Sequence, residues 1–151
     1  MELKIIAKQT TIPAFSPTVI QVKHINYYNY PYTSYEGDEI TEIVIQKILE
    51  QIPKNINICL SLTPFGEDDW LEVISNGNWI TLGYSSNHDG NYYSYNAAFA
   101  DTEDLSPLES GGQSSIKKCF ALQDMIIGQK AVNYFIYTGK LYPGIDWAKQ
   151  V

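Results

Sequence analysis

Arginine is absent from this 151-residue chain: its ten basic residues are all lysine, against 17 acidic residues, and the net charge is −7. Proteins that bind nucleic acid directly usually present a basic face on which arginine contacts phosphate groups. Bilayers that contain anionic lipids attract basic segments in a similar way. The composition therefore predicts neither direct nucleic-acid binding nor attachment to a membrane surface.

Long apolar runs are missing as well. No segment approaches the roughly 18 apolar residues of a membrane-spanning helix. The first 13 residues also lack the apolar stretch of a signal peptide. The two cysteines, Cys59 and Cys119, are interpreted as reduced core thiols, with a disulfide or a metal pair as the alternative. Together these features predict a cytoplasmic protein.

Residues that could support catalysis or hold a metal are few. His24 and His88 show no paired spacing with each other or with the cysteines, so no metal site and no cofactor are predicted. Glu67 and Asp69 could form the pair of carboxylates that glycoside hydrolysis needs, although any two of the 17 acidic residues could do the same. A small hydrolase or sugar-processing enzyme with paired carboxylates is therefore kept as an alternative function.

The overall composition is that of one folded domain. Hydrophobic residues make up 44% of the chain and charged residues 18%. A chain of this length buries about two-thirds of its unfolded surface, so a single domain over residues 1–151 can form a core without disulfides or metal.

Periodicity and turn residues predict an α+β protein with a mostly antiparallel sheet and two main helices packed on one face. One helix is expected at residues 38–52, with Asp38 as N-cap and an apolar arc wide enough for burial on more than one face. The other is expected at about 128–138 and stops at Gly139. Strands are expected at residues 3–8, 18–25, 56–62, 70–75, 79–84, 92–99 and 115–127, the last as one strand or a bent pair. Loops are expected at residues 27–35 and 101–113.

The acidic residues are concentrated in the middle of the chain. Residues 55–116 contain nine acidic residues and no lysine, whereas the rest of the chain holds eight acidic residues and ten lysines. This segment is either a solvated surface that keeps the protein in solution or a surface that a partner recognises. Charge alone favours the solvated surface.

The C-terminal part of the chain carries a more specific pattern. Residues 125–147 combine an apolar segment, a helix in which Phe follows Ala by four residues, a Thr-Gly stop and a Pro-x-x-x-Trp close. The residues of this motif are Ala131, Phe135, Thr138, Gly139, Pro143 and Trp147. The pattern resembles immunity protein family 1 of bacterial polymorphic-toxin and contact-dependent inhibition systems, and a looser similarity extends upstream to residue 38.

One position departs from the family pattern. The family often has proline at the start of the last helix, where this chain has Gly128 and Gln129. Glycine can occupy an N-cap, so Gly128 is expected to begin the helix. The six motif residues are apolar or turn-forming, and we expect them to pack the fold rather than to bind a partner.

The resemblance implies a cytoplasmic immunity protein that is no enzyme and that neutralises the C-terminal toxic domain of a cognate toxin. Such toxins are often nucleases or nucleic-acid deaminases, which are often basic, so an acidic inhibitor with aromatic side chains would complement them. With the resemblance, the acidic segment becomes the predicted binding surface. The predicted toxin-binding residues are Asp89, Tyr92, Tyr93, Asp101, Glu103, Asp104 and Glu109. A non-catalytic scaffold subunit is a further alternative.

Overall fold

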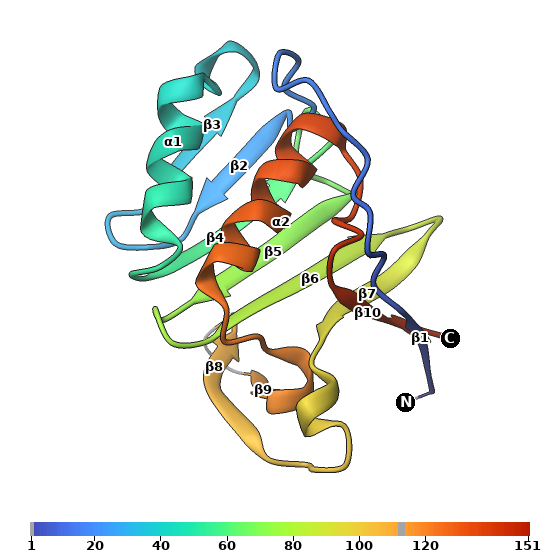
Figure 1. The fold of residues 1–151 in the computed structure, drawn as a ribbon. Helices are drawn as coiled ribbons and strands as arrows, with labels where there is room; N and C mark the ends of the chain where they lie inside the picture. The colour runs from blue at the N-terminus through green and yellow to red at the C-terminus, as the bar shows by residue number, and fades with distance from the viewer. Residues whose placement is uncertain (1, 112–113) are drawn as a thin grey trace.

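The chain forms an antiparallel sheet of eight strands, as the computed structural model shows for residues 2–111 and 114–151 (Figure 1). In spatial order the strands are β1 (Leu3–Ile6), β10 (Asp146–Gln150), β7 (Gly90–Tyr95), β6 (Ile80–Ser86), β5 (Trp70–Ser75), β4 (Ile56–Ser61), β2 (His24–Tyr27) and β3 (Thr33–Glu36). The other elements are α1 (Glu42–Gln51), α2 (Met125–Thr138), a separate hairpin of β8 (Leu105–Ser110) and β9 (Ser114–Lys117), and the 3₁₀ turns η1 (Gly37–Glu39), η2 (Ala97–Phe99) and η3 (Lys118–Phe120).

Both α-helices lie on the same face of the sheet (Figure 1), so the predicted α+β class is confirmed. Strands β4 to β7 pair antiparallel in chain order, in agreement with the predicted antiparallel sheet. The turn between β5 and β6 contains Gly77 at φ 91°, a backbone conformation that favours glycine, and the side chain of Asn76 accepts hydrogen bonds from two backbone N–H groups of the turn. In the part of the chain that the structure describes, neither helix has the length and apolarity to cross a bilayer.

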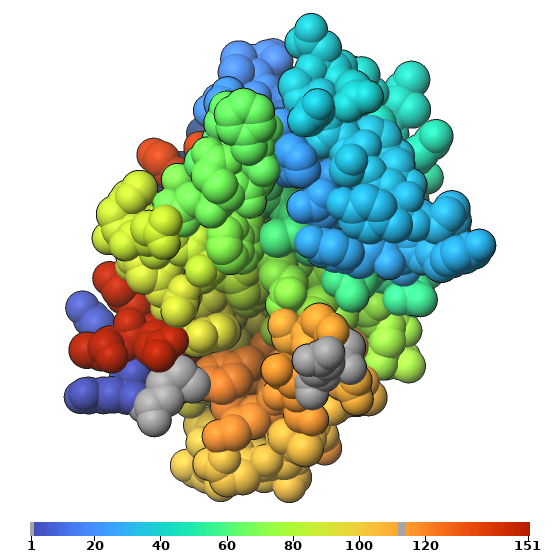
Figure 2. All heavy atoms as spheres, turned by 180° about the vertical axis from the view of Figure 1, so that it is seen from behind, coloured from blue at the N-terminus to red at the C-terminus, as the bar shows by residue number. Residues whose placement is uncertain are grey.

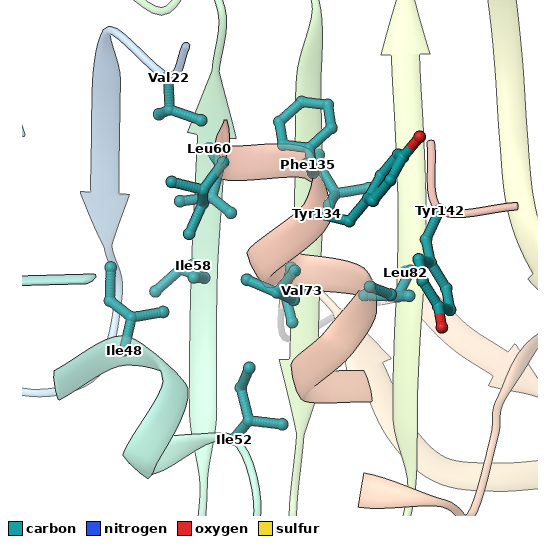
Figure 3. Packing of buried hydrophobic residues seen from close by; sticks show 14 of the residues in the cluster. Val22, Ile48, Ile52, Ile58, Leu60, Val73, Leu82, Tyr134, Phe135 and Tyr142 are labelled. Carbon is teal, nitrogen blue, oxygen red and sulfur yellow. The ribbon is translucent and has the colours of Figure 1, made fainter. Parts of the chain in front are cut away.

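The main core lies between this sheet face and the helices. Val73 and Leu82 of neighbouring strands and Phe135 of α2 belong to this core, and Ile48 and Ile52 close the α1 side (Figure 3). All five side chains are buried. Burial of one such side chain is worth roughly 1.5–3 kcal/mol, so this layer is the main source of stability.

Helix α1 is shorter and less buried than the sequence predicts. Thr41, not Asp38, is the N-cap, because its hydroxyl accepts a hydrogen bond from the N–H of Val44. Asp38 lies in η1 instead. The expected burial on more than one face is also wrong, since Ile43 is 69% exposed.

Helix α2 begins earlier than predicted. Asp124 caps it by accepting hydrogen bonds from the N–H groups of Ile126 and Ile127. Gly128 is therefore not an N-cap; it lies one turn inside the helix, buried against Ile80 of β6. The predicted stop is confirmed, because Gly139 has φ 70°.

The N-terminal region contains two corrections. Residues 18–23 are not a strand, because they lie along α2, where the N–H of Gln21 donates to the carbonyl of Ile136. Farther upstream, Phe15 packs against Tyr134. The loop predicted at residues 27–35 is confirmed only for 28–32, because Tyr27 belongs to β2 and residues 33–35 belong to β3, and these strands pair as a hairpin. Tyrosine and threonine favour strands, so the tyrosine-rich composition is compatible with this pairing.

The region after β7 also differs from the prediction. Residues 101–113 are not an exposed loop, because β8 occupies 105–110 and buries Ser106 and Leu108. Residues 112 and 113 of that prediction lie outside the described residues. Residues 115–127 are not a strand or a bent pair, since β9 ends at Lys117 and is followed by η3 and the start of α2. Leu108 packs with Ile74 and Ala121 in a second, small core that holds the β8–β9 hairpin against the sheet.

Candidate functional site

The face of the sheet opposite the helices is only partly covered. Register places Asn26, Cys59, Glu72, Gly83 and Tyr93 in one row across β2, β4, β5, β6 and β7. We call the surface around this row the open face. The β8–β9 hairpin covers one end of it, and the remainder is hollowed between that hairpin, the β2–β3 hairpin and the loop before β5 (Figure 2).

Two cavities occupy the open face. The larger has a volume of about 690 Å³ and is lined by residues that include Asn26, Tyr28, Trp70 and Glu72. The smaller, of about 300 Å³, lies under the β8–β9 hairpin, and Tyr93 contributes to its wall. Glu72 lines both cavities. These volumes fall within, or at the lower end of, the range of about 300–1,000 Å³ that is typical of ligand pockets.

Glu72 is the central charged residue of the open face. Its Oε1 atom accepts a 2.8 Å hydrogen bond from the hydroxyl of Ser110. Burial, together with the Glu72 charge, raises the pKa of the Cys59 thiol to about 12, so this thiol stays protonated at neutral pH. Among the described residues that line the larger cavity, Glu72 is thus the single charged side chain.

Aromatic side chains border the larger cavity. Tyr28 is 50% exposed, and its ring centroid lies 5.7 Å from that of Tyr32. The hydroxyl of Tyr32 donates a 2.8 Å hydrogen bond to Asn26, which helps to fix the tip of the β2–β3 hairpin. Trp70 at the start of β5 contributes to the cavity wall. The cavity therefore combines aromatic side chains with a carboxylate.

The loop before β5 and the turn before β7 form an acidic end of the molecule. Asp68 accepts a hydrogen bond from the N–H of Asn87, which joins the loop to the turn. Asp69 accepts a 3.3 Å hydrogen bond from the hydroxyl of Tyr84, whereas Glu67 accepts one from a backbone N–H of its own loop. The carboxylates of the alternative hydrolase hypothesis, Glu67 and Asp69, thus have separate partners that stabilise the local loop structure.

The predicted acidic binding residues fall into two groups. Asp101, Glu103 and Asp104 are exposed in the segment between η2 and β8, and Glu103 forms a salt bridge with Lys117 of β9. Glu109 is exposed on β8 of the same hairpin. Asp89 is apart from them, in the turn that precedes β7. The structure therefore gathers four of the predicted acids on the hairpin side and separates the fifth.

The two predicted tyrosines lie on opposite faces of the sheet. Tyr93 lies on the open face, where its ring centroid is 5.3 Å from that of Phe120 and its hydroxyl donates to Gln150. Tyr92 is directed toward the helix face and packs against Tyr84, and the ammonium group of Lys149 lies 5.2 Å from its ring centroid. Tyr93 can therefore contribute to a binding site on the open face, whereas Tyr92 cannot.

The six motif residues of the C-terminal pattern have packing and chain-reversing positions. Ala131 and Phe135 are buried in the core, and the hydroxyl of Thr138 donates a hydrogen bond to the carbonyl of Tyr134. After the Gly139 stop, the indole N–H of Trp147 donates a 2.8 Å hydrogen bond to the carbonyl of Tyr142. Pro143 lies in the turn that leads into β10, and its carbonyl accepts from the N–H of Gln9.

Sequence reasoning did not select Glu72, Trp70 or Tyr28 as site residues. A usable signal was present in β5, where alternation places Trp70, Glu72 and Ile74 on one face. A glutamate between two large apolar residues on one strand face marks a polar position that needs a partner. Tyr28 gave no such signal, because its place beside Glu72 depends on the β2–β4 register.

Residues 2–111 and 114–151 contain no group of three or more histidine, cysteine, aspartate or glutamate side chains arranged to hold a metal ion. No protein-family model matches the chain, and a search of curated proteins finds no match either.

Proposed function

We propose that the protein is a cytoplasmic immunity protein that binds the C-terminal toxic domain of a cognate bacterial toxin and blocks it without catalysing a reaction. The toxin domain is a nuclease or a nucleic-acid deaminase. The resemblance of residues 125–147 to immunity protein family 1 supports this class of protein. The geometry of the open face supports the proposed mode of binding to the partner.

The observation that carries the proposal is the arrangement of acids around a hollow surface. Glu72 lies within the open face, and the β8–β9 side carries Asp101, Glu103, Asp104 and Glu109. A toxin that holds a polyanionic substrate presents a positive surface, which such an arrangement complements. Complementary charge accelerates association and disfavours incorrect partners.

The exposed tyrosines of the β2–β3 hairpin support the same surface. Tyr28 borders the larger cavity, and Tyr32, which is 59% exposed, packs its ring against that of Tyr28. Tyrosine is enriched at the energetic centres of protein interfaces, because it buries a large area and still offers a hydroxyl group. The proposal therefore uses the β2–β3 hairpin as one wall of the toxin-binding surface and the β8–β9 hairpin as the other.

A direct experiment is to measure binding to the toxic domain encoded by the gene immediately upstream. The wild-type protein is expected to form a stable complex with this domain and to suppress its nuclease or deaminase activity. Gly83→Phe is expected to weaken the complex, because a Cβ atom at Gly83 would meet no other atom within 4 Å and the added ring would occupy the smaller cavity of the open face. Gln46→Phe, at an exposed position of α1, is the matched control. Absence of binding and of suppression by the wild-type protein would exclude the proposed function.

A further inference from the structure

The larger cavity of the open face combines two kinds of group that bind cations. Glu72 supplies a carboxylate, and the rings of Tyr28 and Trp70 supply aromatic surface. A carboxylate accepts about four hydrogen bonds, and the hydroxyl of Ser110 uses one of them. Acceptor capacity is therefore left for a ligand, and aromatic faces attract a cation in addition.

No cation of the protein itself occupies this position among the described residues. Lys117 lines the smaller cavity, not the larger one, and is paired with Glu103. The other polar side chains of the larger cavity are uncharged: the amides of Asn26 and Asn57, the hydroxyl of Tyr28, the indole N–H of Trp70 and the thiol of Cys59. Among the described residues, therefore, no cation lines the larger cavity of about 690 Å³ beside Glu72.

The chemistry of the wall distinguishes between the two cationic side chains. A guanidinium group is planar, stacks on aromatic rings and donates two parallel hydrogen bonds to a carboxylate, and it is more weakly hydrated than an ammonium group. A cavity with aromatic walls and a half-buried carboxylate therefore suits arginine better than lysine. Because the protein contains no arginine of its own, the side chain must come from a partner.

We infer that the larger cavity is a receptor for an arginine side chain of the partner, with the guanidinium group on the Glu72 carboxylate and against the aromatic wall formed by Tyr28 and Trp70. The identity of the partner rests on the proposed function, since the toxic domain would supply the arginine. Binding of a guanidinium group to the cavity does not rest on it.

The cavity itself is tested with a small probe. Nα-acetyl-arginine amide is titrated into ¹⁵N-labelled protein, and the amide signals of residues 70–72 and the indole signal of Trp70 are followed by NMR. We expect saturable shifts with a Kd on the order of 1–10 mM, much weaker shifts with the lysine analogue and none with the neutral citrulline analogue. Equal responses to arginine and citrulline, or a stronger response to lysine, would overturn the inference.

Substitutions show which residues produce the NMR shifts. Glu72→Gln is expected to abolish saturation, and its amide oxygen can still accept the Ser110 hydrogen bond, so the fold is retained. Tyr28→Ala is expected to weaken binding several-fold through loss of the aromatic wall. Glu2→Gln, which removes one negative charge near the N-terminus, outside the cavity, is expected to behave as wild type. Saturation that persists in Glu72→Gln would place the guanidinium group elsewhere and refute the inference.

The complex with the toxic domain then separates the two proposals. Glu72→Gln is expected to weaken that complex about tenfold or more, because a desolvated arginine would lose its carboxylate. A complex that forms with wild-type affinity in Glu72→Gln would refute the arginine receptor and leave the proposed function intact. If the toxic domain does not bind the wild-type protein but the probe saturates, the proposed function fails and the guanidinium-binding cavity stands.

Discussion

The hydroxyl of Ser110 donates a 2.8 Å hydrogen bond to the carboxylate of Glu72, and this contact joins the end of β8 to a central strand of the main sheet. The hairpin is also held by the apolar contacts of Leu108 with Ile74 and Ala121. The same carboxylate that we place at the centre of the binding surface therefore also positions the hairpin that borders it.

Loss of this hydrogen bond is expected to loosen the hairpin without unfolding the sheet. Ser110→Ala should lower the free energy of unfolding by roughly 1 kcal/mol, since a single hydrogen bond is worth about that much. Amide hydrogen exchange in β8 and β9 should accelerate, whereas exchange in β4 and β5 should not. Ser114→Ala, an exposed position on β9, is the control. Unchanged exchange in the hairpin of Ser110→Ala would show that the apolar contacts alone hold it.

Gly128 is a second position at which a small change should have a clear result. A Cβ atom there would lie 2.7 Å from Cδ1 of Ile80, which is fully buried. In an exposed helix interior, replacing glycine by alanine stabilises the helix by about 1 kcal/mol. Here overpacking costs roughly 1–3 kcal/mol, so Gly128→Ala is expected to destabilise the protein in urea denaturation.

The double variant tests the cause of that destabilisation. Ile80→Val removes the Cδ1 atom that the new Cβ would contact, at a cost of about 1 kcal/mol by itself. Gly128→Ala combined with Ile80→Val is expected to be less destabilised than the sum of the two single variants. If the changes in unfolding free energy are strictly additive, the contact with Ile80 does not explain why alanine is unfavourable at position 128.

The elements that could be predicted from the sequence are those with strong local signals. Between the strands predicted at residues 70–75 and 79–84, Asn76-Gly77-Asn78 favours the tight turn of the β5–β6 hairpin. Gly139 likewise predicts the end of α2. The helix starts are harder to predict, because several residues near each start are able to cap a helix. Thr41 and Asp124 act as caps in the structure, whereas Asp38 and Gly128 do not.

Other features depended on contacts distant in the sequence. Residues 18–23 have strand-like composition, but the N–H of Gln21 donates to a carbonyl near the end of α2 instead of to a neighbouring strand. β8 lies in a segment rich in acidic residues and serine, a composition that predicts a loop, because the apolar contact of Leu108 with Ile74 cannot be recognised in one sequence. The site as a whole has the same origin: Trp70 and Glu72 share one face of β5, but Tyr28 joins them only through the register of β2, β4 and β5.

Stability is expected to fall at alkaline pH because of the thiol of Cys59, which is partly buried, and the hydroxyl of Tyr84, a buried residue. Burial raises the pKa of Cys59 from 9.0 to about 12, and burial followed by the charge of Asp69 raises that of Tyr84 from 10.0 to about 12. Above the unfolded pKa, the unfolded chain releases a proton that the folded chain retains, so the free energy of unfolding decreases as pH rises. Each group contributes at most about 1.4 kcal/mol per pH unit between its unfolded and folded pKa values.

Urea denaturation between pH 8 and 11.5 measures this effect. Cys59→Ala and Tyr84→Phe should each make the stability less dependent on pH, with the cysteine acting from about pH 9 and the tyrosine from about pH 10. Tyr30→Phe is the matched control, because the side chain of Tyr30 is 99% exposed. An alkaline slope that is the same in wild type and in both variants would contradict the assignment.

Charge reversal on the hairpin side is expected to slow association with the toxic domain. In the triple variant Asp101→Lys, Glu103→Lys and Asp104→Lys, the on-rate should fall about tenfold at low salt, because long-range attraction toward a basic partner becomes repulsion. The difference should shrink at high ionic strength, where surface charges are screened. Glu103→Lys also breaks the salt bridge with Lys117, so circular dichroism must show that the hairpin side remains folded. The control reverses three acids outside residues 55–116, at Glu2, Asp38 and Glu50, which changes the net charge equally. Equal on-rates for the two triple variants would mean that total charge, rather than the hairpin surface, guides the encounter.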